Sequence, residues 1–325
     1  DLHPRVRRQR QMCIRDREKV WYTEKNIEEN RIGGPTRQNG KKISGNCGFV
    51  IESGERSFCM KIYISSDIEG TCGICSWEET EAGSAADEYF RKQMSREAAA
   101  CAQGALDAGA EEVFVRDAHS SAKNIDPSML PRRTRLLRGW PGDPFCMMSG
   151  LDRTFDAAAF TGYHAWASCS GNPLSHTMTR EMESVKINGA YASEFMINAY
   201  IAGYVGVPVV FLSGDRALCD SAAEICPGIS TVAVNEGIGN ASVSIHPDEA
   251  AERIRSAVRE ALRGDYKNDC RVRMPEHFEA ELNYKNHFTA YKYSFYPGAV
   301  LEGGRTVRFR SNDYGEILRF FHFCL

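Results

Sequence analysis

Short apolar runs alternate with longer stretches of helical periodicity from residue 60 onward. Residues 62–64 and 113–115 are short β-rich runs. Between them, residues 86–108 carry apolar or small side chains at positions 90, 94, 98, 101 and 105, which form one stripe of a helix. This order of strand, helix and strand predicts βαβ units and a largely parallel sheet.

The same alternation continues towards the end of the chain. It predicts further strands at 134–137, 157–160, 183–187, 207–212, 230–234, 278–282 and 306–309. It predicts further helices at 193–202, 217–225, 247–262 and 288–293, and a terminal helix after Asp313. Asn188-Gly189 follows one predicted strand directly and is a strong hairpin signal. We expect an α/β protein with three α/β/α layers around a largely parallel sheet, plus a smaller C-terminal α+β portion.

Residues 1–59 differ from the remainder of the chain, because they are rich in charge, Gly and Asn and show no sustained apolar period. Met60 then opens the β-rich run MKIYISSD, so we expect Met60 to be the native start and residues 1–59 to be a non-native or disordered extension. Their acidic residues argue against a transit peptide. We expect a main α/β domain over 60–264 and a C-terminal α+β segment over 265–325, joined by a linker near 264–275.

The charge of the chain is distributed unevenly. The formal net charge is −3, but residues 1–59 hold 13 Lys and Arg against 8 Asp and Glu, which leaves 27 against 35 and about −8 for residues 60–325. An acidic body argues against nucleic acid as a partner, since phosphate binding needs clustered cations. The chain has no run of 18 apolar residues, so the sequence predicts no membrane span. The acidic charge is compatible with a site that binds a cation.

The twelve cysteines are scattered at irregular spacings, and no signal peptide is visible. We therefore expect reduced thiols and a cytoplasmic protein. Cys72 and Cys75 form one C-x-x-C, which by spacing could be redox-active or half of a zinc knuckle. The sequence has no second C-x-x-C at a matching interval, so we interpret Cys72 and Cys75 as buried or loop thiols.

Ionisable residues gather where the predicted strands end. Asp67 and Glu69 follow the first strand, Asp117 and His119 follow the second, and His164 follows the strand at 157–160. Ligand sites of open α/β sheets lie outside these carboxyl ends. Two carboxylates at one point need a cation, and carboxylate with imidazole is the ligand mixture of zinc and similar ions. Each residue alone is typical of a turn or cap, but together they favour a metal centre in which an Asp can bridge two ions.

Three further residues near the predicted strand ends could contribute to such a site or have only a structural role. Glu194 opens a predicted helix, where its carboxylate suits the positive helix end. His176 lies in a predicted loop and could serve as acid, base or oxyanion donor. We expect Asp117 to orient a histidine ring, because metal-bound imidazoles usually donate their other N–H group.

Six short motifs stand in a fixed order along residues 60–325. They are SDIEG at 66–70, DAHS at 117–120, GYHA at 162–165, SHTM at 175–178, NG at 188–189 followed by SE at 193–194, and NAY at 198–200 followed by AGY at 202–204. In order and spacing the chain resembles the zinc-dependent D-aminopeptidases of peptidase family M55, also called the DppA or dipeptide-transport-protein family. Residues 1–59 have no counterpart in this family. Its members are expected to continue the C-terminal helix further, so we expect this helix to be truncated here.

The resemblance implies an aminopeptidase with two Zn²⁺ ions per chain that hydrolyses short peptides with N-terminal D-residues, such as D-Ala-D-Ala, by a metal-activated water. It implies a ring-shaped homodecamer with an internal chamber. The implied zinc ligands are Asp67, Glu69, His119, His164 and Glu194. His176 is the implied catalytic residue that is not a ligand, and Asp67 is the implied bridge between the two ions.

Two alternatives remain open from the sequence. A dinuclear phosphoesterase uses the same ligand types but needs cationic clamps for phosphoryl oxygens, and Arg116 and Arg180 are the only close candidates. A non-catalytic peptide-binding or transport-associated protein would use zinc only to hold a peptide. Hydrolysis of D-Ala-D-Ala or of p-nitrophenyl phosphate distinguishes the three.

Overall fold

The computed structural model describes residues 60–84 and 86–325, so the prediction for residues 1–59 lies outside the described residues. A seven-stranded sheet is formed in the order β3-β2-β1-β4-β7-β8-β9. Its strands are β1 (Lys61–Ser66), β2 (Glu112–Asp117), β3 (Thr134–Leu137), β4 (Ala157–Tyr163), β7 (Val209–Asp215), β8 (Ser230–Ile238) and β9 (Ala241–Ser244). All neighbouring pairs are parallel except β8 with β9, which closes one edge as an antiparallel hairpin.

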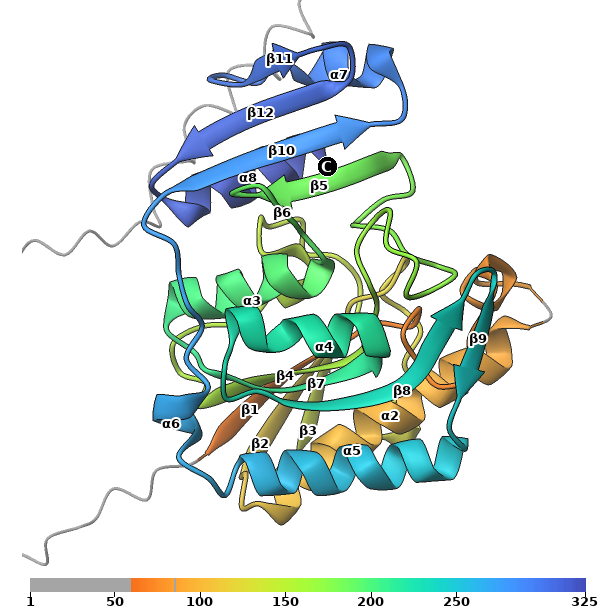
Figure 1. Cartoon of the computed structure of the whole chain (residues 1–325). Helices are drawn as coiled ribbons and strands as arrows, with labels where there is room; N and C mark the ends of the chain where they lie inside the picture. The colour runs from red at the N-terminus through yellow and green to blue at the C-terminus, as the bar shows by residue number, and fades with distance from the viewer. Residues whose placement is uncertain (1–59, 85) are drawn as a thin grey trace, which may run out of the picture. The chain divides into compact units, whose positions relative to one another are not determined.

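Helices cover both faces of this sheet (Figure 1). On one face, α2 (Asp87–Asp107) packs beside α5 (Pro247–Ala261), and on the other lie α3 (Glu194–Val205) and α4 (Arg216–Ile225). Every residue of the central strands β4 and β7 is buried, as expected for strands covered on both sides. The three-layer α/β/α prediction is confirmed.

A second, antiparallel sheet has the order β11-β12-β10-β5-β6. Its strands are β5 (Met182–Ile187), β6 (Ala190–Tyr191), β10 (Phe278–Tyr284), β11 (Val300–Glu302) and β12 (Thr306–Ser311), and it is joined by α7 (His287–Tyr293) and α8 (Tyr314–Cys324). The predicted hairpin is confirmed, because Asn188 and Gly189 both have positive φ between β5 and β6. Since β5 pairs with β10, this sheet combines strands from the predicted main domain (60–264) and from the predicted C-terminal segment (265–325).

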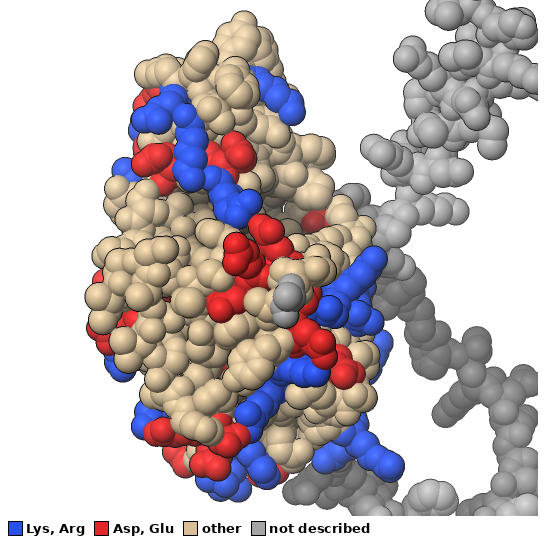
Figure 2. Space-filling model, turned by 90° about the vertical axis from the view of Figure 1, so that its right-hand side faces the viewer, with Lys and Arg blue, Asp and Glu red and all other residues tan. Residues whose placement is uncertain are grey.

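The connections contain further short helices. The region near 264–275 holds α6 (Tyr266–Asp269), and three 3₁₀ turns are η1 (Trp77–Glu79), η2 (Pro127–Met129) and η3 (Cys146–Met148). Cys72 is buried, and burial raises the pKa of its thiol to about 12, which agrees with the interpretation of Cys72 as a buried thiol. Among the helices of residues 60–84 and 86–325, none is long and apolar enough to cross a membrane. On the face drawn in Figure 2, acidic and basic side chains lie side by side.

Candidate metal centre

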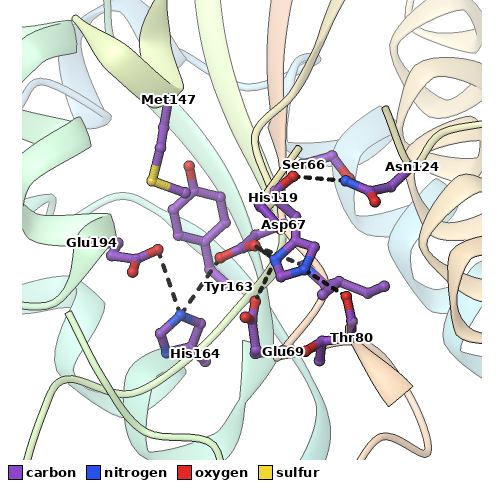
Figure 3. A network of polar contacts seen from close by, with 12 residues as sticks. Ser66, Asp67, Glu69, Thr80, His119, Asn124, Met147, Tyr163, His164 and Glu194 are labelled. Atoms are coloured by element: carbon purple, nitrogen blue, oxygen red, sulfur yellow. Dashed lines mark hydrogen bonds and ion pairs between the residues drawn. The ribbon is translucent and has the colours of Figure 1, made fainter. Parts of the chain in front are cut away.

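The carboxyl ends of three adjacent strands meet at one place. Asp67 and Glu69 follow β1, His119 follows β2 and His164 follows β4, and all four side chains are buried. Glu194 is the first residue of α3 and points to the same place, as Figure 3 shows. His176 lies in the loop between β4 and β5, with its ring stacked on that of His164 at 4.3 Å between centroids. The structure therefore brings together all six predicted site residues.

Two glycines allow the loop after β1 to lie directly against the end of β4. The amide of Gly70 donates to the Gly162 carbonyl at 2.8 Å, and a Cβ on Gly70 would collide with the Tyr163 carbonyl. Gly162 has a φ of 69°, and a Cβ there would collide with the Asp67 carbonyl. Only residues without a side chain permit this approach, which places Asp67 beside His164.

The six side chains form two groups joined by Asp67. In one group, His119 Nδ1 lies 3.1 Å from Glu69 Oε2 and 3.3 Å from Asp67 Oδ1. The other consists of His164, His176 and Glu194, in which His164 Nε2 lies 3.5 Å from Glu194 Oε2 and His176 Nε2 lies 3.5 Å from Glu194 Oε1. Asp67 Oδ2 lies 3.5 Å from His164 Nε2 and so joins this group to the first. Asp67 thus directs one carboxylate oxygen to each group, as Figure 3 shows. This is the arrangement that a carboxylate bridging two ions requires.

Each of the three imidazoles is fixed by a backbone carbonyl on its outer side. His119 Nε2 donates to the Thr80 carbonyl at 3.0 Å, His164 Nδ1 to that of Ala165 at 2.9 Å, and His176 Nδ1 to that of Leu174 at 2.9 Å. Because a carbonyl can only accept, the proton of each neutral ring lies on that outer nitrogen. The lone pair of the other nitrogen therefore faces the carboxylates, as a metal ligand needs.

The donor atoms fit zinc. Asp67 Oδ2, Glu69 Oε2 and His164 Nε2 are buried and lack a hydrogen-bond partner among the described residues, a costly arrangement for polar atoms. The oxygen and nitrogen donors around a tetrahedral zinc ion lie about 3.4 Å apart, given bonds of about 2.1 Å. The observed separations of 3.1 to 3.5 Å match this spacing. Imidazole with carboxylate is also the donor set that zinc prefers.

Burial and close charges shift the pKa of every group in the cluster. Burial raises the pKa of Asp67 well above its usual range, and the nearby Glu69 raises it further. Burial would also raise the pKa of Glu194, but His164 outweighs it and lowers that pKa to about 2. The carboxylates overcome the effect of burial on His119 and His164 and raise their pKa values. Burial and the neighbouring His164 lower the pKa of His176, so this ring is neutral at pH 7.

The prediction that Asp117 orients a histidine ring is wrong. Its carboxylate accepts from the backbone amides of Asn124 and Ile125 at 2.5 and 2.8 Å, and so fixes the loop that follows His119. The side chain of Asn124 in turn donates to the His119 carbonyl at 2.7 Å. Asp117 therefore positions His119 through the backbone, while the ring itself is held by Thr80.

Sequence reasoning did not include Asp215 or Asn172. Asp215 is buried at the end of β7, and its carboxylate accepts from the Ala165 amide at 2.6 Å and from Asn172 Nδ2 at 3.1 Å. The same Asn172 amide group donates to the Glu69 carbonyl at 2.9 Å. These contacts tie the segments of Glu69 and His164 together. The signal was available, because Asp215 stands at a strand end like the predicted ligands.

A cavity of about 380 Å³ opens onto the cluster. Its wall includes Asp67, Glu69, His119, His176 and Glu194, and also two tryptophans, Trp77 and Trp140. The Trp77 ring meets His176 edge to face at 5.1 Å between centroids. The cluster is thus accessible to a small molecule, while most of its polar atoms are removed from water.

Comparison with known proteins agrees with this geometry. Residues 60–323 match the profile of peptidase family M55, described as D-aminopeptidase. A D-aminopeptidase of Bacillus subtilis (strain 168) is 33% identical over 259 residues, which cover 79% of this chain and 93% of that protein. A solved structure, the Zn-dependent D-aminopeptidase DppA from Bacillus subtilis, described as a self-compartmentalizing protease, superposes with a TM-score of 0.75 at 31% identity. It covers 82% of this chain and 96% of that one. The chain therefore belongs to the M55 family of D-aminopeptidases, as its six motifs predict.

Proposed function

We propose that the protein is a zinc-dependent aminopeptidase that removes an N-terminal D-residue from short peptides. The observation that carries the proposal is Asp67, whose two carboxylate oxygens face two separate groups of imidazole and carboxylate ligands. Family membership and the zinc dependence of the solved relative support it. Asp67, Glu69 and His119 would hold one ion, and Asp67, His164 and Glu194 the other.

The residues around the ions have separate tasks. Zinc, when bound, supplies Lewis acidity that polarises the peptide carbonyl and activates a water molecule. His176 is the neutral base of the site, because its Nδ1 proton is held by the Leu174 carbonyl and its Nε2 lone pair faces the cavity side, 3.5 Å from Glu194 Oε1. His176 Nε2 accepts a proton from the water and donates it to the departing amine. Trp77 packs against this ring and limits its movement.

The cationic side chains do not favour a phosphoesterase. Arg116 is fully buried, donates from Nη1 to the Gly139 carbonyl at 2.6 Å, and packs on Trp140 at 4.3 Å, so it is not part of the cavity wall. Among the described residues that line the cavity, Arg180 is the single Lys or Arg. Two phosphoryl oxygens beyond the metals would need more cationic donors.

Hydrolysis of defined peptides tests the proposal. The protein is stripped of metal with a chelator, reloaded with Zn²⁺, and incubated with D-Ala-D-Ala, L-Ala-L-Ala and p-nitrophenyl phosphate. We expect zinc-dependent release of D-Ala from the first compound and much slower reaction of the other two. Preferential hydrolysis of the phosphate ester, or no hydrolysis of the D-peptide by the reloaded protein, contradicts the proposal.

We also propose that copies of the chain assemble into a closed ring, with a decamer as the expected size. The self-compartmentalizing relative supports this, and so does a group of exposed aromatic side chains on and just after α7. Phe288 and Tyr291 share one face of α7, and Phe295 meets Tyr291 edge to face at 5.2 Å between ring centroids. Exposed aromatic side chains that lie together are typical of a protein interface. Light scattering tests it: the wild type is expected as a large oligomer that Phe295→Glu dissociates, whereas a monomeric wild type contradicts the proposal.

A further inference from the structure

The cavity has a strongly asymmetric charge. Four carboxylates line it, those of Asp67, Glu69, Glu81 and Glu194, and Arg180 is the single Lys or Arg among the described lining residues. A dipeptide substrate has the same asymmetry, with an amine at one end and a carboxylate at the other. The ligand cluster suits the amine and the scissile carbonyl, which leaves the carboxylate end without an assigned partner.

Arg180 is held at the wall near the proposed base. Its guanidinium lies over the Trp77 ring at 4.7 Å, and Trp77 in turn touches the His176 ring at 5.1 Å. These two contacts place the guanidinium within about 10 Å of the His176 ring. In a dipeptide the C-terminal carboxylate lies one residue, about 3.5 Å, beyond the scissile carbonyl, and a hydrogen bond of about 3 Å at each end extends this reach to about 10 Å. A substrate whose scissile bond lies near His176 therefore has its C-terminal carboxylate in the range of Arg180.

The existing partner of Arg180 is easily replaced. Its Nη1 lies 3.5 Å from Glu81 Oε1, and the two side chains are 55% and 60% exposed. Such an exposed pair at this distance contributes little to stability. The planar guanidinium can bind another carboxylate through two parallel hydrogen bonds. The contact with the face of Trp77 is compatible with this, since a guanidinium over an aromatic ring can still donate hydrogen bonds from its N–H groups.

We propose that Arg180 binds the C-terminal carboxylate of the substrate, so that the protein selects short peptides with a free C-terminus; this rests on the proposed aminopeptidase function. Arg180 is a specificity residue and takes no part in bond breaking. The carboxylate lies away from the reacting carbonyl and keeps its charge throughout the reaction. Arg180 therefore binds substrate and transition state equally, and its loss raises KM while kcat stays nearly constant.

The test compares D-Ala-D-Ala with its C-terminal amide, D-Ala-D-Ala-NH₂, on the zinc-loaded protein. The wild type is expected to favour the free acid by about tenfold in KM, the range of one partly exposed charge-assisted hydrogen bond. In Arg180→Ala the KM of the free acid rises about tenfold, the KM of the amide is unchanged, and the preference disappears. Arg180→Lys retains part of it. Glu81→Gln, which removes the competing carboxylate, lowers the KM of the free acid.

A matched control and a binding measurement complete the experiment. Arg135 is 69% exposed on β3, pairs with Glu112 at 3.2 Å and does not line the cavity, so Arg135→Ala is expected to keep the preference. In a His176→Ala background, calorimetry is expected to show weaker binding of D-Ala-D-Ala after Arg180→Ala, with no change for the amide.

Each other outcome has a definite meaning. Equal hydrolysis of acid and amide by the wild type, or a preference that survives Arg180→Ala, overturns this inference and leaves the proposed function standing. Equal losses for both substrates in Arg180→Ala show a structural role and also overturn it. Failure of the wild type to hydrolyse either peptide overturns the proposed function, and the inference with it.

Discussion

Glu97 on α2 is a buried acid that supports the loop of Asp67 and Glu69. Its side chain is fully buried, and its Oε1 accepts from the Cys72 amide at 2.8 Å and from Gln93 Nε2 at 2.9 Å. Its Oε2 has no partner among the described residues. Burial raises the pKa of this carboxyl to about 7. Glu97 is therefore protonated in the folded protein under mildly acidic conditions, and we predict that Glu97→Gln removes a pH dependence of stability.

The sign and size of this pH dependence follow from the difference between the pKa of Glu97 in the folded and the unfolded protein. The folded pKa of about 7 exceeds the unfolded value of about 4.3, so the folded state binds this proton more tightly. The stabilising contribution is complete below the unfolded pKa and is lost as pH rises through the folded pKa. Between pH 5 and pH 8 the wild type loses about 3 kcal/mol through this group, at about 1.4 kcal/mol per pH unit up to pH 7. Glutamine does not titrate, so the variant does not lose stability through this position.

The free energy of unfolding is measured by urea unfolding, followed by tryptophan fluorescence, at several pH values. A chelator is present throughout, so that metal binding does not contribute. The free energy of unfolding of Glu97→Gln minus that of the wild type should increase by about 3 kcal/mol from pH 5 to pH 8. Glu88 lies on the same helix, exposed and paired with Lys92, and Glu88→Gln is the matched control without this increase. Parallel curves for Glu97→Gln and the wild type would refute the reasoning.

Two further substitutions test the site. His176→Ala should keep its zinc and its fold while kcat falls about 100-fold or more, the usual scale for one acid–base group, as metal analysis and D-Ala-D-Ala hydrolysis check; loss of zinc would show that His176 is a ligand. Gly162→Ala should lower the affinity for zinc and destabilise the fold by about 1–3 kcal/mol, because a Cβ would displace the Asp67 backbone; zinc titration and thermal unfolding check this, and an unchanged protein would contradict it.

Local patterns were sufficient to predict six of the seven strands of the main sheet, all except β9, and to place Asp67, Glu69, His119 and His164 at one edge of it. The roles expected of Glu194 and His176 came from the family resemblance. Parallel strands bring their carboxyl ends to one edge, so the positions of Asp67, His119 and His164 after their strands already imply proximity. The pairing of β5 with β10 was not predictable in this way, since the two strands are far apart in the sequence and their alternation does not identify a partner.

The supporting contacts were predicted less well, for a physical reason. The carbonyls of Thr80, Ala165 and Leu174 fix the imidazoles, and a backbone acceptor has no signature in the sequence. The stacking of Arg180 on Trp77 joins two loops about a hundred residues apart, which only the fold places together. Asp117 was assigned to a ring that a carbonyl already holds.

Zinc content is the most direct test of the bridged two-metal centre. The wild type and Asp67→Ala are reloaded with excess Zn²⁺, separated from free metal, and analysed for zinc per chain by mass spectrometry. We predict about two equivalents for the wild type and fewer than one for Asp67→Ala, because the loss of a shared carboxylate removes a ligand from both ions and leaves their charges opposed. Two equivalents in Asp67→Ala, or none in the wild type, would contradict a centre built around this residue.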